Sequence, residues 1–311
     1  MILVTGGNGF LGSQIVKQLV AIGQQVTVFD SSPISSRLAA VKDNINYVMG
    51  DILDLESIIE SIKQYNVHRI IHLAYFRDIA LQERYPTKAV KINCVGFNNI
   101  LEAARLCDIE RVVWASSVAV YGPPDLYREP VGEEQLPAPA TLYGACKYFN
   151  EYLAQQFYKV YGLETVALRP TVVYGEGRWY SGFSSVARDM FYDVITKKKV
   201  VISDGDKRLD WLYIEDAARA FVLAIQAEKI KSRVFNIAGE VATIAEAAGV
   251  LKDLVPEVEI EVLKGGKETW PAALDISRAR EELGYRPRYT LREGFQKYLE
   301  AIKKEVGENG M

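Results

Sequence analysis

Short apolar runs alternate with longer amphipathic stretches through the first half of the chain. The runs predict buried strands at residues 2–5, 25–29, 47–49, 69–73, 111–116 and 164–168. The stretches between them predict helices at residues 11–23, 55–65, 86–107 and 142–161. Apolar strands separated by helices are typical of a parallel sheet covered on both faces. The pattern therefore predicts an α/β fold built on a Rossmann-type, doubly wound parallel sheet.

The regularity weakens beyond residue 170. A helix is still predicted at residues 214–226, and the apolar run at 234–238 predicts a strand that returns to the main sheet. A helix, a charged strand and a final helix follow from residue 242 onward. We therefore expect a larger domain of residues 1–169, joined again by 210–238, and a smaller C-terminal α/β domain of residues 170–209 and 239–311.

Charge and hydropathy exclude several classes of protein. The net charge is −3 and the isoelectric point about 5.7, so nothing points to nucleic acid or to an anionic membrane surface. The apolar runs are far shorter than the ~20 residues of a membrane span. Met1 is followed at once by the first strand, which leaves no room for a secretory signal. We expect a cytoplasmic protein that binds neither nucleic acid nor membranes.

Metal chemistry and hydrolytic triads are also disfavoured. The three cysteines lack metal-ligand spacing, and their odd number argues against a disulfide framework. The chain has only two histidines, His68 and His72, and histidine is the commonest metal ligand and general base. We expect no metal site, and we expect His72 to end a strand with a local hydrogen bond.

A glycine-rich turn follows the first predicted strand. Gly6, Gly9 and Gly12 lie between that strand and an amphipathic helix. Glycines here permit a tight turn, close approach to a diphosphate and close helix–strand packing, while the helix N-terminus offers its N–H groups to phosphate. The context predicts dinucleotide binding rather than a plain turn.

Two aspartates follow later strands on the same side. Asp30 ends the second strand, where a carboxylate can accept both hydroxyls of the adenosine ribose and would repel a 2′-phosphate. The cofactor is therefore predicted to be NAD, which makes residues 1–169 the NAD-binding domain. Asp51 is a candidate for the adenine edge, and an N-cap of the next helix is the alternative role.

The candidate catalytic groups lie on one predicted helix and one strand end. Tyr143 and Lys147 are four residues apart, so a helix places both on one face. A nearby cation favours the phenolate, and tyrosine can then exchange a proton with an alcohol while hydride leaves or returns at that carbon. Ser117 follows a strand, at the edge where doubly wound sheets bind ligands, and can donate to the reacting oxygen.

Taken together, these motifs resemble the extended short-chain dehydrogenases/reductases, the superfamily of NAD-dependent epimerases and dehydratases. The matching segments run over nearly the whole chain: Thr5 to Gly12, His72 to Ala74, Asn93, Trp114 to Gly122, Tyr143 and Lys147, Leu168 to Pro170, Asp210 to Asp216, and Asp275 to Ala279.

The resemblance implies roles for particular residues. Ser117, Tyr143 and Lys147 would form the catalytic triad, and Lys147 would also hold the nicotinamide ribose. Asn93 would steady the helix behind the site, and the helices that carry Asn93 and Tyr143 would pair across a homodimer. The residues expected to bind the cofactor are Gly6, Gly9, Phe10, Leu11, Gly12, Asp30, Asp51, Ile52, Leu73, Ala74, Asn93, Tyr143, Lys147 and Pro170.

The reaction is less narrowly defined. Dehydratases of this superfamily carry an Asp-Glu pair after the strand-end serine or threonine, and Val118-Ala119 stands there in this chain. Epimerisation of a nucleotide sugar, a UDP-sugar 4-epimerase reaction, is the leading expectation. Three departures weaken it: Val172 replaces the usual asparagine, Leu209 replaces an arginine beside Arg208, and no arginine lies near residues 264–267.

Net oxidation of a small hydroxy compound such as threonine, an aldonate or a polyol is the alternative. The segment Glu268 to Pro271, which contains Trp270, resembles that of short-chain L-threonine dehydrogenases. A cofactor-binding sensor without turnover is a minor alternative. Such proteins usually lose the tyrosine or the lysine, whereas this chain has both Tyr143 and Lys147. Candidates to face the small-molecule substrate are Tyr75, Phe76, Arg77, Ser117, Arg178, Trp179 and Tyr180, and Trp270 covers the site or packs the smaller domain.

Overall fold

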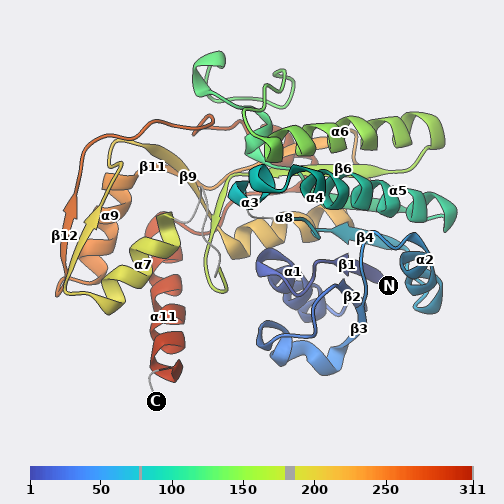
Figure 1. Cartoon of the computed structure of the whole chain (residues 1–311), viewed down its shortest axis with the longest axis horizontal. Helices are drawn as coiled ribbons and strands as arrows, with labels where there is room; N and C mark the ends of the chain where they lie inside the picture. Colours follow the sequence, from blue (N-terminus) through green and yellow to red (C-terminus); the bar gives the residue numbers. More distant parts are fainter. Residues whose placement is uncertain (77–78, 179–185, 310–311) are drawn as a thin grey trace.

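A seven-stranded parallel sheet forms the centre of the larger domain (Figure 1). The computed structural model describes residues 1–76, 79–178 and 186–309. The strand order is β10-β6-β5-β4-β1-β2-β3, so it reverses between β1 and β4. The bounds are β1 Ile2–Thr5, β2 Val26–Asp30, β3 Ile45–Met49, β4 Arg69–His72, β5 Arg111–Ala115, β6 Thr165–Pro170 and β10 Val234–Ile237. This order confirms the predicted Rossmann-type, doubly wound α/β fold.

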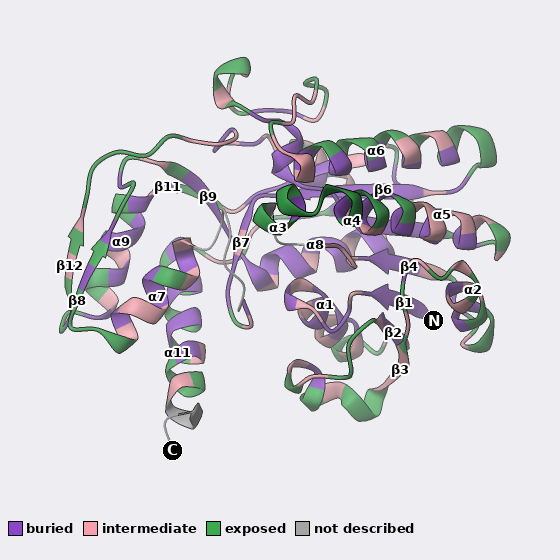
Figure 2. Cartoon of the chain, viewed as in Figure 1, coloured by how far each residue is buried: buried purple, intermediate pink, exposed green. Residues whose placement is uncertain are grey.

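Helices cover both faces of this sheet, as the buried strands predict. On one face lie α1 (Phe10–Ala21), α8 (Ile214–Gln226) and α10 (Ser277–Leu283), around a core of aliphatic side chains. On the other lie α2 (Leu55–Gln64), α5 (Gly96–Leu106) and α6 (Leu142–Tyr161). Figure 2 shows the strands buried between these layers and the outer helix faces exposed.

The helix that carries the predicted catalytic pair has strong local signals at both ends. The Thr141 side chain caps the start of α6 by accepting from the Gly144 N–H at 3.1 Å. Gly162 ends the helix in a left-handed conformation, with φ of 72°, that glycine adopts without strain. These caps explain why the sequence predicts the bounds of α6 so closely.

The helix predicted at residues 86–107 is interrupted. It consists of α4 (Pro86–Val90), a π-helical turn (Lys91–Val95) and α5, and it follows a short helix α3 (Ile79–Arg84). A π-helical turn adds a residue to the backbone ring without changing the apolar periodicity much, so the sequence pattern does not show it. This turn carries Asn93 and Cys94.

The remaining elements pack beside the first sheet as a smaller layered unit. Three strands form one sheet in the order β11-β9-β7, and two form another, β12-β8. The strands are β7 Val172–Tyr174, β8 Lys199–Ile202, β9 Arg208–Tyr213, β11 Glu240–Thr243 and β12 Glu259–Val262, and the helices are α7 Val186–Thr196, α9 Ile244–Leu254 and α11 Leu291–Asn309. Trp211, Phe191, Phe295 and Tyr298 lie at the centre of their shared core.

The chain crosses between the two units more than once. β10 pairs in parallel with β6, with Val234 opposite Ala167, so the predicted strand at 234–238 does join the main sheet. Residues 210–213, however, lie in β9 of the smaller sheet. The predicted division of the chain into an NAD-binding and a substrate-binding domain stays a prediction.

Candidate active site

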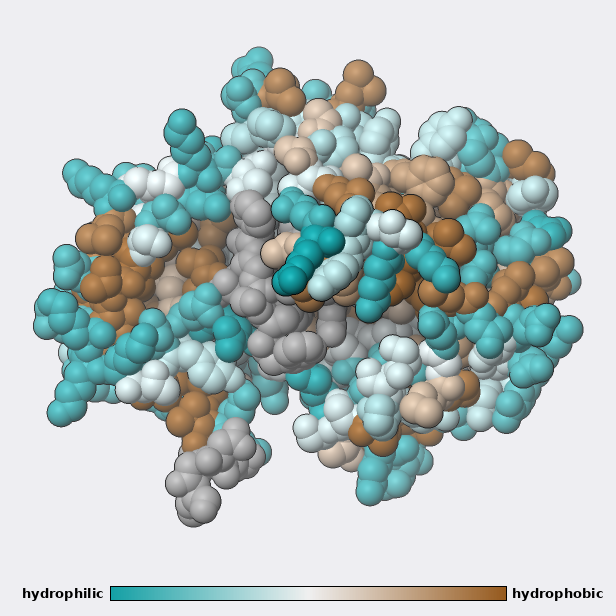
Figure 3. All heavy atoms as spheres, viewed as in Figure 1, coloured by the Kyte–Doolittle hydropathy of each residue, from teal (hydrophilic) through white to brown (hydrophobic). Residues whose placement is uncertain are grey.

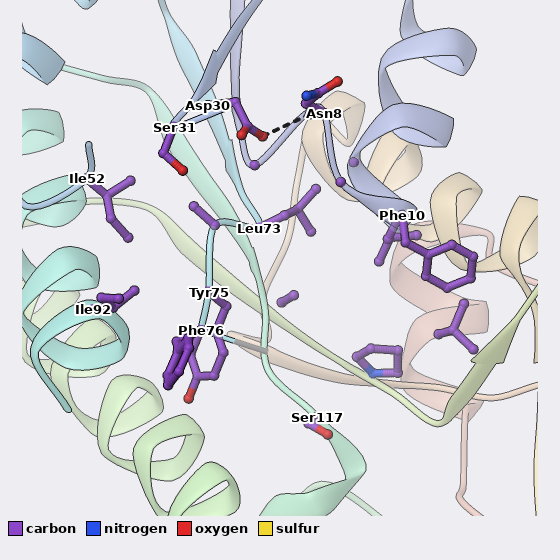
Figure 4. Close-up of a pocket in the computed structure, with 18 of the residues that line it drawn as sticks. Asn8, Phe10, Asp30, Ser31, Ile52, Leu73, Tyr75, Phe76, Ile92 and Ser117 are labelled. Carbon is purple, nitrogen blue, oxygen red and sulfur yellow. Dashed lines mark hydrogen bonds between the residues drawn. The ribbon is translucent and has the colours of Figure 1, made fainter. Parts of the chain in front are cut away.

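A cavity of about 710 Å³ lies at the carboxyl edge of the main sheet, where the strand order reverses (Figure 4). Such switch points are the usual ligand sites of doubly wound folds. Both structural units line it. The predicted site residues along its wall are Gly6, Gly9, Phe10, Leu11, Gly12, Asp30, Asp51, Ile52, Leu73, Ala74, Tyr75, Phe76, Ser117, Tyr143, Lys147, Pro170 and Arg178.

A few predicted residues lie elsewhere. Asn93 is buried behind the cavity, where its Oδ1 accepts from the Phe76 N–H at 2.8 Å and its carbonyl accepts from Asn150 Nδ2 at 2.8 Å. It thereby ties the loop after β4 to α6. Arg77, Trp179 and Tyr180 lie outside the described residues.

The glycine turn forms a cradle that side chains would fill. Gly6 adopts φ of 68°, and a Cβ on it would lie 2.6 Å from the Ala74 nitrogen. A Cβ on Gly12 would lie 2.2 Å from the Gly6 carbonyl oxygen. α1 begins directly beyond the turn, with Gly9 as its N-cap, so the N–H groups of its first turn face the cavity. The backbone is thus shaped for a diphosphate at a helix N-terminus.

Asp30 is held in place at the end of β2 by two backbone donors. Its Oδ2 accepts from the Asn8 N–H and its Oδ1 from the Ser32 N–H, each at 3.1 Å (Figure 4). The Asn8 side chain in turn donates to the Pro33 carbonyl at 2.8 Å and accepts from Ser35. The carboxylate keeps lone pairs for further donors, which suits the hydroxyls of a ribose.

Asp51 occupies a tight turn after β3 rather than a helix cap. Its Oδ1 accepts from the Leu53 N–H at 2.9 Å, and Asp54 is the residue that caps α2. The alternative N-cap role for Asp51 is therefore wrong. The side chain is exposed and lies on the cavity wall beside Ile52.

Ser117, Tyr143 and Lys147 all line the cavity. Lys147 is buried, and its Nζ donates to the Ala115 carbonyl at 2.5 Å. Its ammonium lies 5.7 Å from the centre of the Tyr143 ring. Ser117 caps a single 3₁₀ turn by accepting from the Ala119 N–H at 3.2 Å. A cation, a phenol and a hydroxyl on one cavity wall form a set suited to proton transfer.

Burial shifts the pKa values of Lys147 and His72. Desolvation lowers the pKa of Lys147 to about 7, because the ammonium is cut off from water. Desolvation, with the nearby Lys147 charge, also lowers the pKa of His72 to about 3. His72 ends β4 and its Nδ1 lies 2.7 Å from the Thr5 hydroxyl, so its predicted strand-end hydrogen bond is confirmed.

A buried ion pair near the candidate catalytic residues was not predicted. Arg169 on β6 and Glu151 on α6 form two contacts of 2.6 and 2.8 Å, and both side chains are almost fully buried. Ser116 donates to the same carboxylate at 2.5 Å, and Arg169 donates to the Tyr121 hydroxyl at 2.7 Å. Glu151 lies one helical turn beyond Lys147. This spacing could have indicated from the sequence that the Glu151 carboxylate lies on the same helix face as the lysine.

The wall opposite the cofactor cradle is mostly apolar. Val172 and Trp270 line it, and the buried Arg178 donates to the Val173 carbonyl. Leu209 is buried in the core of the smaller unit and does not reach the cavity wall. Arg208, its neighbour, is held by Glu129 at 2.9 Å and Glu268 at 3.0 Å.

Other residues on the wall were not predicted to bind the cofactor or the substrate. They are Asn8, Phe29, Ser31, Ser32, Pro33, Ser35, Arg37, Gly50, Lys88, Ile92, Ala115, Ser116, Val118, Ala119, Thr171, Val172, Val173 and Trp270, of which the last was predicted only to cover the site or pack. Eight of these eighteen lie directly beside a predicted residue. The strand-end rule, applied to whole loops, would have found those that follow β2, β3, β5 and β6, but not Lys88, Ile92 or Trp270.

Metal sites and membrane spans are both lacking in the described parts of the chain. Within residues 1–76, 79–178 and 186–309, no group of three or more His, Cys, Asp or Glu side chains could hold a metal ion. Across the same described ranges, no helix combines the length and apolar character needed to cross a membrane.

The fold and the site together define a nicotinamide-dependent enzyme class, with a dinucleotide cradle facing a tyrosine–lysine pair. The model of the NAD dependent epimerase/dehydratase family matches residues 2–238, and the chain belongs to this family. It is an NAD-dependent enzyme of that class, as the motifs predicted. The glycine cradle, which a single Cβ would fill, and the fixed Asp30 carboxylate fit the cofactor.

The chain is similar to proteins with two different activities. A UDP-glucose 4-epimerase of Mycolicibacterium smegmatis is 30% identical over 318 residues, covering 97% of this chain and 98% of that protein. The crystal structure of the Thermotoga maritima UDP-glucose 4-epimerase with UDP-glucose matches with a TM-score of 0.87 and 27% identity, over 98% and 99% of the chains. The L-threonine dehydrogenase of Clostridium difficile matches with a TM-score of 0.85 and 25% identity, over 98% of both chains.

Proposed function

We propose that the protein removes hydride from a secondary alcohol carbon, with Tyr143 as the acid/base. The observation that carries this proposal is that Ser117, Tyr143 and Lys147 line the same cavity as the dinucleotide cradle, with Lys147 Nζ 5.7 Å from the centre of the Tyr143 ring. Bound NAD supplies the hydride acceptor. The described residues hold the alcohol, move its proton and exclude water.

Each catalytic side chain has a distinct task in this proposal. Tyr143 takes the alcohol proton as the hydride leaves, and Ser117 donates a hydrogen bond to the same oxygen as it becomes a carbonyl. Lys147 stabilises the Tyr143 phenolate and contacts the nicotinamide ribose. The Ala115 carbonyl, which accepts from Nζ, keeps the ammonium near the Tyr143 ring.

For the substrate, we propose a UDP-sugar and a 4-epimerase reaction. The similar UDP-glucose 4-epimerases, matched over nearly their whole lengths, support this choice. In such a reaction the sugar becomes a ketone, turns in the site and receives hydride on its other face. Val118 and Ala119 line the cavity without any acid or base of their own, which argues against water elimination.

One observation favours a second candidate, net oxidation of a small hydroxy compound. A nucleotide sugar needs cations for its diphosphate, yet Leu209 is buried in the core and Arg208 is paired with two carboxylates. Besides Lys147, the cations among the described residues of the cavity wall are Arg37, Lys88 and Arg178, and Arg178 donates to the Val173 carbonyl. A small alcohol has no such need. The similarity to an L-threonine dehydrogenase fits this candidate equally.

One assay separates the two candidates. The purified full chain is incubated with NAD+ and either UDP- and dTDP-sugars or threonine, aldonates and polyols, while absorbance at 340 nm is followed. Conversion of a UDP-sugar to its 4-epimer without net NADH establishes the epimerase. Sustained NADH formation with a small alcohol establishes the dehydrogenase and rejects the epimerase.

A matched pair of variants tests the catalytic role itself. Tyr143→Phe should lower kcat by about 10³-fold, because general acid–base catalysis contributes 10²–10⁴-fold. Tyr158→Phe removes the same hydroxyl from an exposed position on the same helix and should change kcat less than about 2-fold, since surface changes act weakly. Equal effects of the two substitutions would reject Tyr143 as the acid/base.

We further propose a homodimer formed through α5 and α6. Exposed apolar side chains gather on these helices, and Figure 3 shows apolar surface on this side of the molecule. They include Leu106, Tyr148, Phe149, Tyr152, Val160 and Tyr161, with Val95 in the adjoining π-helical turn. Phe149→Glu should convert a dimer to a monomer in analytical ultracentrifugation, whereas Leu136→Glu, exposed elsewhere, should not. A monomeric wild-type chain would reject the proposal.

A further inference from the structure

The ring of Tyr75 contacts both members of the catalytic pair. Its centre lies 3.5 Å from Lys147 Nζ, which is within cation–π range. Its edge meets the Tyr143 ring at a centroid distance of 5.5 Å and an interplanar angle of 83°. Lys147 is thus held between the Ala115 carbonyl and an aromatic face.

We infer that Tyr75 is a positioning residue, whose ring keeps the Lys147 ammonium charged and directed beside Tyr143, rather than a substrate-binding residue. This role goes beyond the proposed function, because it concerns a residue that acts through Lys147. It also changes the interpretation of Tyr75 from the sequence, where its place after β4 suggested contact with substrate.

The structure fixes the Tyr75 ring against this helix face. The next residue, Phe76, donates its N–H to Asn93 Oδ1 at 2.8 Å, and its carbonyl accepts from Gln82 Nε2 at 2.5 Å. The Tyr75 hydroxyl is shut off from solvent. Figure 4 shows the rings of Tyr75 and Phe76 side by side on the helix side of the cavity. A phenol with a buried hydroxyl offers the cavity a ring and no polar group.

Three other groups that face Lys147, namely Cys146, Cys94 and Glu151, also favour its charged form, against the desolvation that disfavours it. From α6, Glu151 is already paired with Arg169, and Tyr143 and Cys146 lie beside the lysine. From the π-helical turn comes Cys94, and from β4 comes His72, whose lowered pKa keeps it neutral.

The charged and neutral forms of Lys147 are therefore close in free energy near neutral pH. Because burial lowers the pKa of Lys147 to about 7, a modest change in its surroundings decides whether it is charged near neutral pH. The ring face of Tyr75 acts in favour of the charged form.

An NMR titration tests the inference without any substrate. The Lys147 side-chain signal is followed against pH in the full chain, labelled with [ε-¹³C]lysine and assigned with Lys147→Met. Tyr75→Leu should lower the pKa of Lys147 by about one unit, since a desolvated cation–π contact is worth about that much. Tyr75→Phe, which keeps the ring, should titrate within about 0.3 units of the wild type.

A fluorinated ring separates charge from shape. Replacing Tyr75 with 3,4,5-trifluorophenylalanine keeps the volume while weakening the negative ring face, so the pKa of Lys147 should fall as it does in Tyr75→Leu. This variant also decides the matter if Tyr75→Leu fails to fold. Phe76→Leu, at the neighbouring ring, should leave the Lys147 titration unchanged. Equal titrations of the wild-type and fluorinated proteins would overturn the inference.

The kinetic consequence depends on the proposed function, but the titration does not. With an active substrate, Tyr75→Leu should shift the pH at which kcat rises upward while KM for the substrate changes little, and Tyr75→Phe should restore the wild-type profile. A large rise in KM in Tyr75→Phe, with an unchanged pH profile, would return Tyr75 to the substrate-binding residues. If no substrate is found, the proposed function fails while the NMR result still stands.

Discussion

The two walls of the cavity are lined by different kinds of chemical group. The cofactor wall consists largely of backbone and of groups held in place. They are glycines on which a Cβ would clash, the hydrogen-bonded Asp30 carboxylate and the buried Lys147. The opposite wall carries apolar side chains such as Val172 and Trp270, and its arginine, Arg178, donates to the Val173 carbonyl. The first wall tolerates little change, whereas the second can vary in sequence at small energetic cost. This difference explains why family membership is clear while the substrate is not.

The buried ion pair near the candidate catalytic residues should give the largest effect. Glu151→Gln leaves the Arg169 charge buried without its partner, which should lower the free energy of unfolding by about 3–5 kcal/mol. Asp253→Asn breaks an exposed pair with Arg292 and should cost less than about 1 kcal/mol. Urea unfolding monitored by circular dichroism measures both. A loss below about 1 kcal/mol in Glu151→Gln would show that the pair is not a stability element.

His72 should make the stability of the folded protein sensitive to acid. The unfolded chain takes up a proton on this side chain below pH ~6.5, whereas burial lowers the pKa in the fold to about 3. Its stabilising contribution is thus complete above pH ~6.5 and is lost as the pH falls. Between pH 7 and 4.5, the wild type should lose about 3 kcal/mol more than His72→Asn in urea unfolding.

The exposed His68 provides the matched position for this experiment. His68→Asn should follow the wild-type dependence of stability on pH. Parallel curves for the wild type and His72→Asn would contradict the prediction.

The glycine cradle should show a loss of cofactor affinity. In Gly12→Ala, the new Cβ meets the Gly6 carbonyl oxygen at 2.2 Å, so the turn must move. Binding of NAD+ should weaken by about 100-fold, or about 2.7 kcal/mol, in isothermal titration calorimetry.

A glycine in the smaller unit serves as the control for the cradle. Gly249 lies in α9, where a Cβ on it would meet nothing within 4 Å. Gly249→Ala should leave NAD+ affinity unchanged and raise stability by about 0.5–1 kcal/mol, because alanine is the better helix former. Equal NAD+ affinities of the Gly12→Ala and wild-type proteins would remove the turn from the binding site.

Arg208, which lies outside the cavity wall, should give the smallest effect. Arg208→Gln breaks the contacts to Glu129 and Glu268, and since these groups are partly exposed, it should cost less than about 1 kcal/mol. KM for the active substrate should change less than about 2-fold, because the guanidinium is occupied by protein carboxylates. A tenfold rise in KM for a UDP-sugar, with kcat retained, would show that Arg208 turns to the diphosphate and would favour the epimerase.

The sequence predicted the larger sheet well because its signals are local. β1 and α6 agree with their predicted bounds, since apolar runs, glycines and caps mark them along the chain. The three-stranded sheet was missed. β7 and β11 have only three and four residues, and the sheet pairs residues that lie far apart, such as Val172 with Trp211, so no local period reveals it.

The candidate site shows the same division. The glycine turn and the Tyr143–Lys147 spacing follow from backbone and helix geometry, so they are visible in the sequence. The contact of Tyr75 with Lys147, and that of Arg208 with Glu129, depend on tertiary packing between distant segments. A sequence alone could nominate these residues but could not tell which neighbours they engage.

The pairing of β10 with β6 has a consequence for synthesis on the ribosome. β6 ends at Pro170, but its partner is not made until Val234 to Ile237 leave the exit tunnel. Until then, an apolar strand edge of the nascent chain lacks its neighbour, and open strand edges are templates for association. Ribosomes stalled near residue 209 should therefore carry chains that chaperones bind, and release at residue 240 should end that binding.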